Sequence, residues 1–183
     1  MIIQTHLLRA ALVCVAKHDP RYYLQGIHIS NKYIEATNGH VAVRMEHGIK
    51  TRRDAILEFR GSIPAKANTT EIKFTEEPFA IHRDKNGHRV GFSALVSHKG
   101  ARFPDLDRVI PTEYELCLPP MQAIYLSYPE KMFGKVRGYN AVSLHPSGMT
   151  NTCLFKFSEG VNTTFGNPQF VVMPVRVEVY HND

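Results

Sequence analysis

A cation beside two aromatic residues is the most chemically suggestive group in the sequence. The segment His18–Tyr23 (HDPRYY) lies between a helix-like and a strand-like stretch. An arginine can contact a phosphate while a tyrosine ring stacks on a base or sugar, so this segment could bind nucleic acid. A structural role is simpler: Arg21 pairs with Asp19, and one tyrosine packs inward as the strand begins. On the residues alone we favour the structural role.

Residues for catalysis or metal binding are not gathered in a recognisable pattern. The sequence has no G-x-S-x-G, P-loop or H-E-x-x-H motif, and its ten histidines are scattered. Asp105 and Asp107 could hold a divalent ion, but a solvated loop is the better interpretation. We therefore expect no enzyme activity, no metal and no cofactor.

The net charge of +5 is concentrated in the first third of the chain. Residues 1–60 hold nine Lys and Arg against five Asp and Glu, whereas the rest holds thirteen against twelve. A basic excess of this size suits contact with a polyanion such as DNA, although many proteins carry as much without such a partner. The charge permits nucleic-acid binding without establishing it.

The composition is that of a folded globular protein. Of the 183 residues, 43% are hydrophobic and 21% are charged. No apolar run approaches the about 20 residues of a membrane span, and the N-terminus does not resemble a signal peptide. Cys14, Cys117 and Cys153 are an odd number without C-x-x-C spacing, which favours reduced thiols and a cytoplasmic protein.

The first 47 residues predict one helix followed by three strands. Apolar residues recur at helical spacing from Leu7 to Val15, with Thr5 as candidate N-cap and Asp19-Pro20 as the stop. The strands are expected over residues 24–30, 33–36 and 40–44. Between the last two, Asn38-Gly39 is the strongest turn signal in the chain.

The remainder predicts a β-rich middle and a second unit of the same order. Strands without a helix are expected at residues 55–59, 71–75, 79–83 and 89–97, and then an extended connector, Phe103–Pro111. The last third predicts a short strand at 115–118 and a helix that starts at Pro119-Pro120 and ends at Pro129. Strands separated by loops are then expected at residues 138–145, 152–158 and 170–179.

Four segments resemble those of the bacterial sliding clamp, the DNA polymerase III beta subunit. They occur in the family's order and are HDPRYYLQG (His18–Gly26), ATNGHVA (Ala36–Ala42), FPDLDRVIP (Phe103–Pro111) and FVVMPVRV (Phe170–Val177). The resemblance implies an α+β DNA-clamp (processivity-factor) fold with two αβββ-type units whose helices lie on one face of antiparallel sheets. We expect one clamp-like domain over residues 1–183, made of the first unit (1–47), the β-rich middle and connector (48–111) and the second unit (112–183).

The chain also departs from this family. A clamp subunit has three domains and is considerably longer, so the first domain and about half of the third are expected to be missing. Loop residues are expected in place of the helix that should follow a strand like Ser62–Ala65. These departures predict a shortened clamp of phage, plasmid or prophage type.

In the family, linear peptide motifs of polymerases and of the clamp loader bind a pocket between the second and third domains. The resemblance implies that a largely apolar set would line it here: Leu24, Thr37, Gly39, His40, Val41, Ala42, Pro111, Val171, Met173, Pro174, Val175 and Arg176. Val41 stands where the family usually has arginine, and Ala42 where it has leucine, which predicts a shallower pocket. The alternative is that Val171 and Met173 merely fill a core.

The resemblance further implies that His18, Arg21, Tyr22 and Tyr23 face DNA, with the charge of Lys17 beside them. A clamp holds DNA by encircling it, and the family's ring closes through its first and third domains. Closure here would need a homo-oligomer with new contacts.

Two functions are consistent with these features. The first is a sliding-clamp-like processivity or tethering factor that binds double-stranded DNA and replication proteins carrying clamp-binding motifs. The alternative is a clamp mimic that forms no ring, captures clamp-binding partners and modulates host replication without encircling DNA. The basic charge near Tyr22 and Tyr23 favours the first, whereas the lost helix and small net charge favour the second. We prefer the first for its simplicity.

Overall fold

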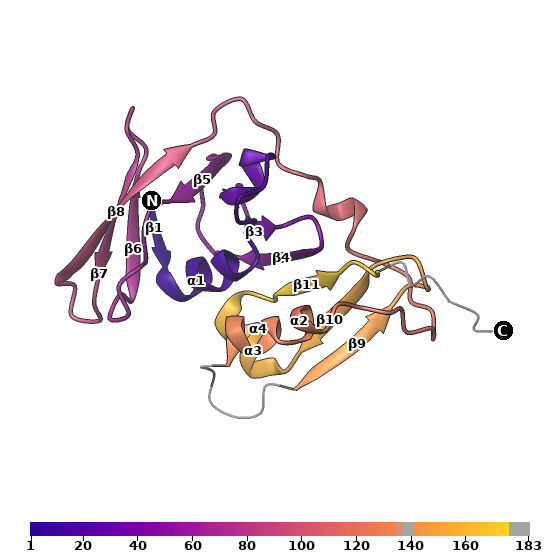
Figure 1. The fold of residues 1–183 in the computed structure, drawn as a ribbon. Helices are drawn as coiled ribbons and strands as arrows, with labels where there is room; N and C mark the ends of the chain where they lie inside the picture. Colours follow the sequence, from indigo (N-terminus) through magenta and orange to yellow (C-terminus); the bar gives the residue numbers. More distant parts are fainter. Residues whose placement is uncertain (135, 137–140, 176–183) are drawn as a thin grey trace.

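The computed structural model describes residues 1–134, 136 and 141–175 (Figure 1). Its strands form an 11-stranded sheet in the order β1-β6-β7-β8-β5-β2-β3-β4-β11-β10-β9. Every pair of neighbouring strands is antiparallel. The predicted α+β class, with helices packed on one face of antiparallel strands, is confirmed.

The N-terminal unit follows the predicted order, with a short strand added before the helix. Its elements are β1 (Ile2–Gln4), α1 (Thr5–Val13), the 3-10 turn η1 (Tyr22–Gln25), β2 (Ile27–Ile29), β3 (Tyr33–Thr37) and β4 (Val41–Glu46). The helix ends well before Asp19-Pro20. Thr5 does not cap it, because Thr5 is the first helical residue and its hydroxyl bonds the Thr70 hydroxyl.

The middle of the chain contains four strands and no α-helix. They are β5 (Ala55–Phe59), β6 (Thr69–Lys73), β7 (Phe79–Arg83) and β8 (Arg89–Ser97). Residues 62–68 form a loop, as predicted for the place of the helix that should follow Ser62–Ala65. The connector is not fully extended, because it contains the 3-10 turn η2 (Leu106–Arg108).

The C-terminal part differs most from the predicted pattern. Its elements are α2 (Ala123–Leu126), α3 (Tyr128–Phe133), β9 (Val142–Pro146), β10 (Cys153–Phe157), α4 (Glu159–Phe165) and β11 (Gln169–Val172). The strand predicted at 115–118 is reduced to an isolated bridge between Glu115 and Ser147. The predicted strand residues 138–140 and 176–179 lie outside the described residues.

Three helix predictions in this part were wrong. The first helix begins at Ala123 and not at Pro119-Pro120. Pro129 does not end a helix but occupies the first turn of α3, where its missing N–H costs nothing. The loop expected between β10 and β11 contains α4 instead, since Val161 and Phe165 lie four residues apart and are both buried. Gly166 ends this helix at φ 63°, and a side chain there would collide with the Glu46 carbonyl.

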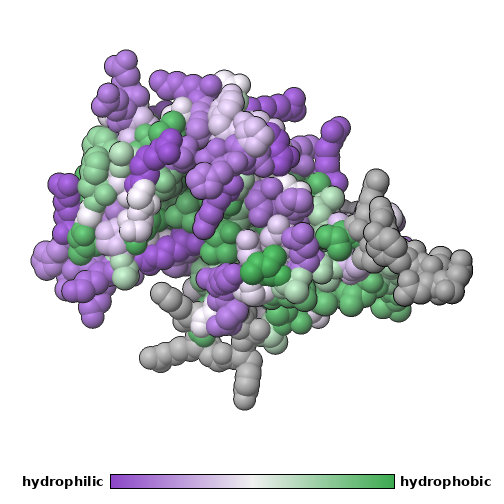
Figure 2. Space-filling view, viewed as in Figure 1, coloured by the Kyte–Doolittle hydropathy of each residue, from purple (hydrophilic) through white to green (hydrophobic). Residues whose placement is uncertain are grey.

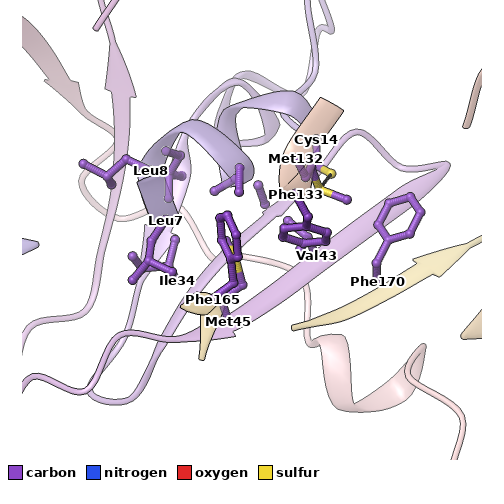
Figure 3. Packing of buried hydrophobic residues seen from close by; sticks show 14 of the residues in the cluster. Leu7, Leu8, Cys14, Ile34, Val43, Met45, Met132, Phe133, Phe165 and Phe170 are labelled. Atoms are coloured by element: carbon purple, nitrogen blue, oxygen red, sulfur yellow. Dashed lines mark hydrogen bonds between the residues drawn. The ribbon is translucent and has the colours of Figure 1, made fainter. Parts of the chain in front are cut away.

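The main core lies between the helices and one face of the sheet (Figure 3). Helices α1, α3 and α4 contribute Leu7, Leu8, Met132, Phe133 and Phe165, which pack against Ile34, Val43, Met45 and Phe170 of the central strands. Burial in this core raises the pKa of the Cys14 thiol, which makes it a poor nucleophile. No helix within the described ranges has the length and apolar character needed to cross a membrane.

A smaller core lies under the connector that joins the two parts of the chain. Ala42, Ile56, Leu154 and Val171 of the sheet pack there against connector residues Phe103 and Leu106. The turn η2 of the connector therefore lies against β4 and β11, the two paired strands that join the N-terminal unit to the C-terminal part.

Candidate functional site

A cavity of about 210 Å³ lies where the connector crosses β4 and β11. Its lining is mostly apolar and comes from four separate parts of the chain. The lining residues are Arg21, Tyr23, Leu24, Thr37, Gly39, Val41, Ala42, Pro104, Asp105, Leu106, Val109, Val171 and Met173.

The floor of the cavity is the seam between β4 and β11. Ala42 lies opposite Val171 in the antiparallel register, and Thr37 of β3 lies opposite Ala42 on its other side. All three are buried. The small Ala42 side chain leaves room above the sheet, and Val171 supplies an apolar surface.

The connector forms one wall. Leu106 packs against the sheet, and the Asp105 carboxylate caps η2 by accepting from the Asp107 amide at 3.1 Å. The Thr152 hydroxyl donates to the Val109 carbonyl at 2.6 Å, which ties the end of the turn to the C-terminal part. These bonds hold Pro104, Leu106 and Val109 over the floor.

The turn before β4 forms the rim. The Asn38 side chain accepts from the amides of His40 and Val41, and the Thr37 hydroxyl donates to the Val41 carbonyl at 2.7 Å. Gly39 has φ 87°, and a Cβ there would lie 2.9 Å from the Arg21 guanidinium. The turn favours glycine at this position, and any side chain there would displace the Arg21 guanidinium.

The Arg21 guanidinium stands at this rim in a defined orientation. It donates two hydrogen bonds to Asp19, from Nε to Oδ1 at 2.9 Å and from an Nη to Oδ2 at 2.8 Å. These hydrogen bonds from Arg21 hold the pKa of the Asp19 carboxyl at about 2. The pairing between Arg21 and Asp19 that the residues suggested is confirmed.

A charged network beside the cavity braces the connector. Arg44 of β4 donates to Glu35 of β3 and to Asp107 of the connector. The His28 ring bonds Glu35 at 2.7 Å and stacks on Phe103 with ring centroids 4.7 Å apart. Burial opposes protonation of His28, but the bonds to Glu35 and Asp54 outweigh it and raise the pKa of His28.

The chemistry of the cavity is that of binding. Apolar side chains line its depth, while Arg21, Thr37 and Asp105 supply polar groups at its edges, the usual arrangement of a site that receives apolar side chains. Nowhere in residues 1–134, 136 and 141–175 are three His, Cys, Asp or Glu side chains grouped to hold a metal ion.

Seven of the residues predicted for the pocket line this one cavity. They are Leu24, Thr37, Gly39, Val41, Ala42, Val171 and Met173. The two residues for which a core role was the alternative differ: Val171 is buried in the smaller core, whereas Met173 is 38% exposed.

The other predicted pocket residues lie elsewhere. His40 is exposed and stacks on Tyr125, and Pro111 and Pro174 are not in the lining. The Val175 amide donates to the Pro120 carbonyl, which directs the chain away from the cavity. Arg176 lies outside the described residues.

The connector wall was missed in the sequence. Pro104, Asp105, Leu106 and Val109 line the cavity, although only Pro111 of this segment was predicted to do so. The spacing of Leu106 and Val109, three residues apart, was the available signal, because it places both on one side of a helical turn.

The residues predicted to face DNA fall into two groups. Arg21 and Tyr23 line the cavity. Lys17, His18 and Tyr22 are exposed outside it, with the Tyr22 ring 5.2 Å from the ring of His98. The two groups adjoin each other, because Arg21 is exposed and the rings of Tyr22 and Tyr23 lie 5.8 Å apart.

Comparison with known proteins relates the chain to one group by structure alone. No protein-family model matches it, and no curated protein matches it in sequence. The sliding clamp (DNA polymerase III subunit beta) from Bartonella birtlesii bound to griselimycin superposes with a TM-score of 0.66 at 14% identity. The beta subunit from Pseudomonas aeruginosa gives 0.62 at 15% identity, and the clamp from Bacillus subtilis gives 0.58 at 14%.

Each of these likenesses covers 97% of the chain but only 64–66% of the neighbour. The chain thus spans slightly less than two thirds of the length of these clamps. Since the match extends over nearly all of its residues, the chain has the fold of the bacterial sliding clamp, the DNA polymerase III beta subunit.

Proposed function

We propose that this protein is a clamp-like replication factor that binds linear peptide motifs of replication proteins in the cavity beside Met173. The observation that carries the proposal is the cavity itself, an apolar groove with polar groups at its edges on a clamp fold. An extended peptide can place apolar side chains in such a groove while its backbone meets polar groups at the rim. The proposed role is binding rather than catalysis.

Two of the structural neighbours support the proposal that this fold can bind a ligand. The clamps from Bartonella birtlesii and Pseudomonas aeruginosa were both solved bound to griselimycin. Griselimycin is therefore a suitable first probe for this chain. In this test griselimycin takes the place of the peptide motif, because the proposal predicts that both ligands bind in the same groove.

The test is a titration of griselimycin into the wild-type protein and two variants, followed by calorimetry. Met173→Ala should weaken binding by about tenfold with little loss of stability, because the side chain is partly exposed at the cavity. Val171→Ala should also lower the free energy of unfolding, by roughly 1–3 kcal/mol, because Val171 is buried. Unfolding of Met173→Ala would show that this residue belongs to the core, and undiminished binding by both variants would place the ligand elsewhere.

We propose further that the protein tethers its partners to double-stranded DNA. Lys17, His18 and Tyr22 are exposed together beside η1, in the part of the chain that carries most of the net positive charge. A few such contacts suit weak, sequence-independent attachment to phosphates. A clamp mimic without DNA binding is the alternative, and a DNA titration separates the two.

The proposed setting is the cytoplasm. Cys14, Cys117 and Cys153 are all free thiols, as expected of a protein in a reducing compartment.

A further inference from the structure

The sequence contains the tripeptide Asn-Gly-His twice. It occurs at residues 38–40, at the rim of the cavity, and at residues 86–88, in the turn between β7 and β8. In both places the glycine lies in the left-handed region, with φ of 87° at Gly39 and 85° at Gly87. The two sites therefore share their local sequence and their glycine conformation, so a difference in their reactivity must come from the surrounding fold.

An asparagine that is followed by glycine can lose its side-chain amide without an enzyme. The backbone nitrogen of the glycine attacks Cγ of the asparagine, and the new C–N bond closes a five-membered succinimide. The bond from Cγ to the amide nitrogen breaks and releases ammonia, which carries away the proton of the glycine N–H. Water then adds across a C–N bond of the ring and opens it to aspartate or to isoaspartate. Glycine favours the attack because it has no Cβ to shield its nitrogen.

At the rim of the cavity, three hydrogen bonds oppose this reaction. The Asn38 side-chain oxygen accepts from the amides of His40 at 2.9 Å and Val41 at 3.0 Å, which fixes the orientation of Cγ. The Gly39 amide, which would be the nucleophile, donates to the Thr37 hydroxyl at 3.1 Å. Ring closure at Asn38 would disrupt these bonds and with them the start of β4.

The Asn86 side chain is not held in this way. It is exposed, and within the part of the chain that the structure describes it makes no hydrogen bond. Figure 2 shows a hydrophilic surface at the lower left of the molecule, where Figure 1 places the lower ends of β7 and β8. The Gly87 amide donates to the Asp84 carbonyl at 3.1 Å, so one hydrogen bond of the nucleophile must break before the ring can close.

We propose that Asn86 is a site of spontaneous modification, converted through a succinimide to isoaspartate and aspartate, and that the fold protects Asn38 from the same reaction. The product carries a new negative charge close to Asp84. Isoaspartate also adds a methylene group to the main chain between residues 86 and 87. The Asp84 carboxylate accepts from the amides of Asn86 and His88, each at 2.9 Å, so this insertion lies between two groups that it binds and should loosen the turn.

Peptide mapping by mass spectrometry, after prolonged incubation of the wild-type protein in warm, mildly alkaline buffer, tests the proposal. Conversion replaces an NH2 group by OH and raises the peptide mass, and isoaspartate accepts a methyl group from a protein isoaspartyl methyltransferase. We expect Asn86 to convert at least about tenfold faster than Asn38, because several hydrogen bonds must break at Asn38. In protein unfolded by guanidinium chloride the two sites should convert at similar rates.

The matched control is Asn86→Gln. Glutamine would have to close a six-membered ring, which forms more slowly, so the modification at this position should disappear while Asn38 stays unmodified. Because the Asn86 side chain is exposed, its replacement should leave the turn intact.

Conversion of Asn38 as fast as Asn86 in the folded protein would overturn the proposal. So would an Asn86 that stays intact in the folded protein for the time in which the unfolded chain converts. An equal preference for Asn86 in the unfolded chain would also overturn it, because the local sequence would then set the difference. No residue of the turn 84–88 lines the cavity, so this result is independent of the proposed function.

Discussion

At the scale of single residues, the candidate site depends on a glycine that the chain cannot replace freely. Gly39 and Gly87 have nearly the same positive φ, 87° and 85°, but only a side chain on Gly39 would meet Arg21. Either alanine substitution should lower the free energy of unfolding by about 1–2 kcal/mol through backbone strain alone.

Only Gly39→Ala should also weaken griselimycin binding, because it displaces the Arg21 guanidinium from the rim. Urea unfolding and calorimetry on the two variants measure these effects. Equal griselimycin affinity in both variants would show that the position of Arg21 is irrelevant to the site.

Buried His82 and half-buried His28 make the stability depend on pH in opposite directions. Burial lowers the pKa of His82, which lies between the Thr70 and Ser93 hydroxyls, whereas hydrogen bonds raise the pKa of His28 despite its burial. Both have an ordinary value of 6.5. As the pH falls below that value the unfolded chain binds a proton that folded His82 resists, so His82 lowers stability in acid.

His28 has the reverse effect. Its contribution is complete below pH 6.5 and fades as the pH rises through its raised folded pKa. Urea unfolding between pH 5 and 8.5 should therefore show His28→Gln losing more stability at the acid end. In His82→Gln the acid loss seen in the wild-type protein should shrink. Parallel pH profiles for the two variants would contradict this assignment.

At the scale of elements, the connector is the part that turns a sheet surface into a cavity. Asp107 is exposed and ties η2 to Arg44, while Arg44 keeps its second partner, Glu35. Asp107→Asn should loosen the connector wall, and it leaves the Arg44 guanidinium paired with the Glu35 carboxylate. We expect griselimycin affinity to fall about two- to fivefold, the effect of losing a partly exposed ion pair.

The melting temperature of Asp107→Asn should change little. Lys85→Ala, a change at an exposed charge in a distant hairpin turn, provides the control. An unchanged affinity in Asp107→Asn would mean that the wall is held by Leu106 and Thr152 alone.

Element prediction from the sequence succeeded where the pattern was local. β5, β7 and β8 have the predicted bounds, because apolar alternation and turn residues mark both of their ends. α4 was missed because Val161 and Phe165 stand among Gly, Asn and Thr, residues that favour loops unless tertiary packing buries the apolar pair.

The site was only partly predictable for a similar reason. The sheet side, from Thr37 to Ala42 and at Val171, lies in segments that resemble the clamp family. The wall depends on how residues 104–109 cross a sheet that the distant β4 and β11 form together. That crossing depends on tertiary contacts such as the bond from Thr152 to Val109. The spacing of Leu106 and Val109 indicates that both lie on one side of a turn, but it does not indicate which part of the sheet that turn crosses.

At the scale of the whole molecule, the open question is contact with DNA. The double variant Lys17→Ala with Tyr22→Ala should weaken binding to duplex DNA and lower the slope of log K against log salt by about one. The residues are exposed outside the cavity, so griselimycin binding should not change. Fluorescence anisotropy at several salt concentrations gives the slope.

Lys85→Ala again serves as the control, since it removes one exposed charge at a distance from η1. An unchanged slope in the double variant would remove this surface from the DNA proposal. Griselimycin binding without any DNA binding by the wild-type protein would favour the clamp mimic.

The central claim is that the cavity under the connector receives the ligand, and amide chemical-shift mapping on isotope-labelled protein tests it most directly. Titration with griselimycin should shift the amides of three segments together: Thr37–Ala42, Leu106–Val109 and Val171–Met173. Binding that instead shifts amides remote from these segments, or no binding at all, would contradict the account.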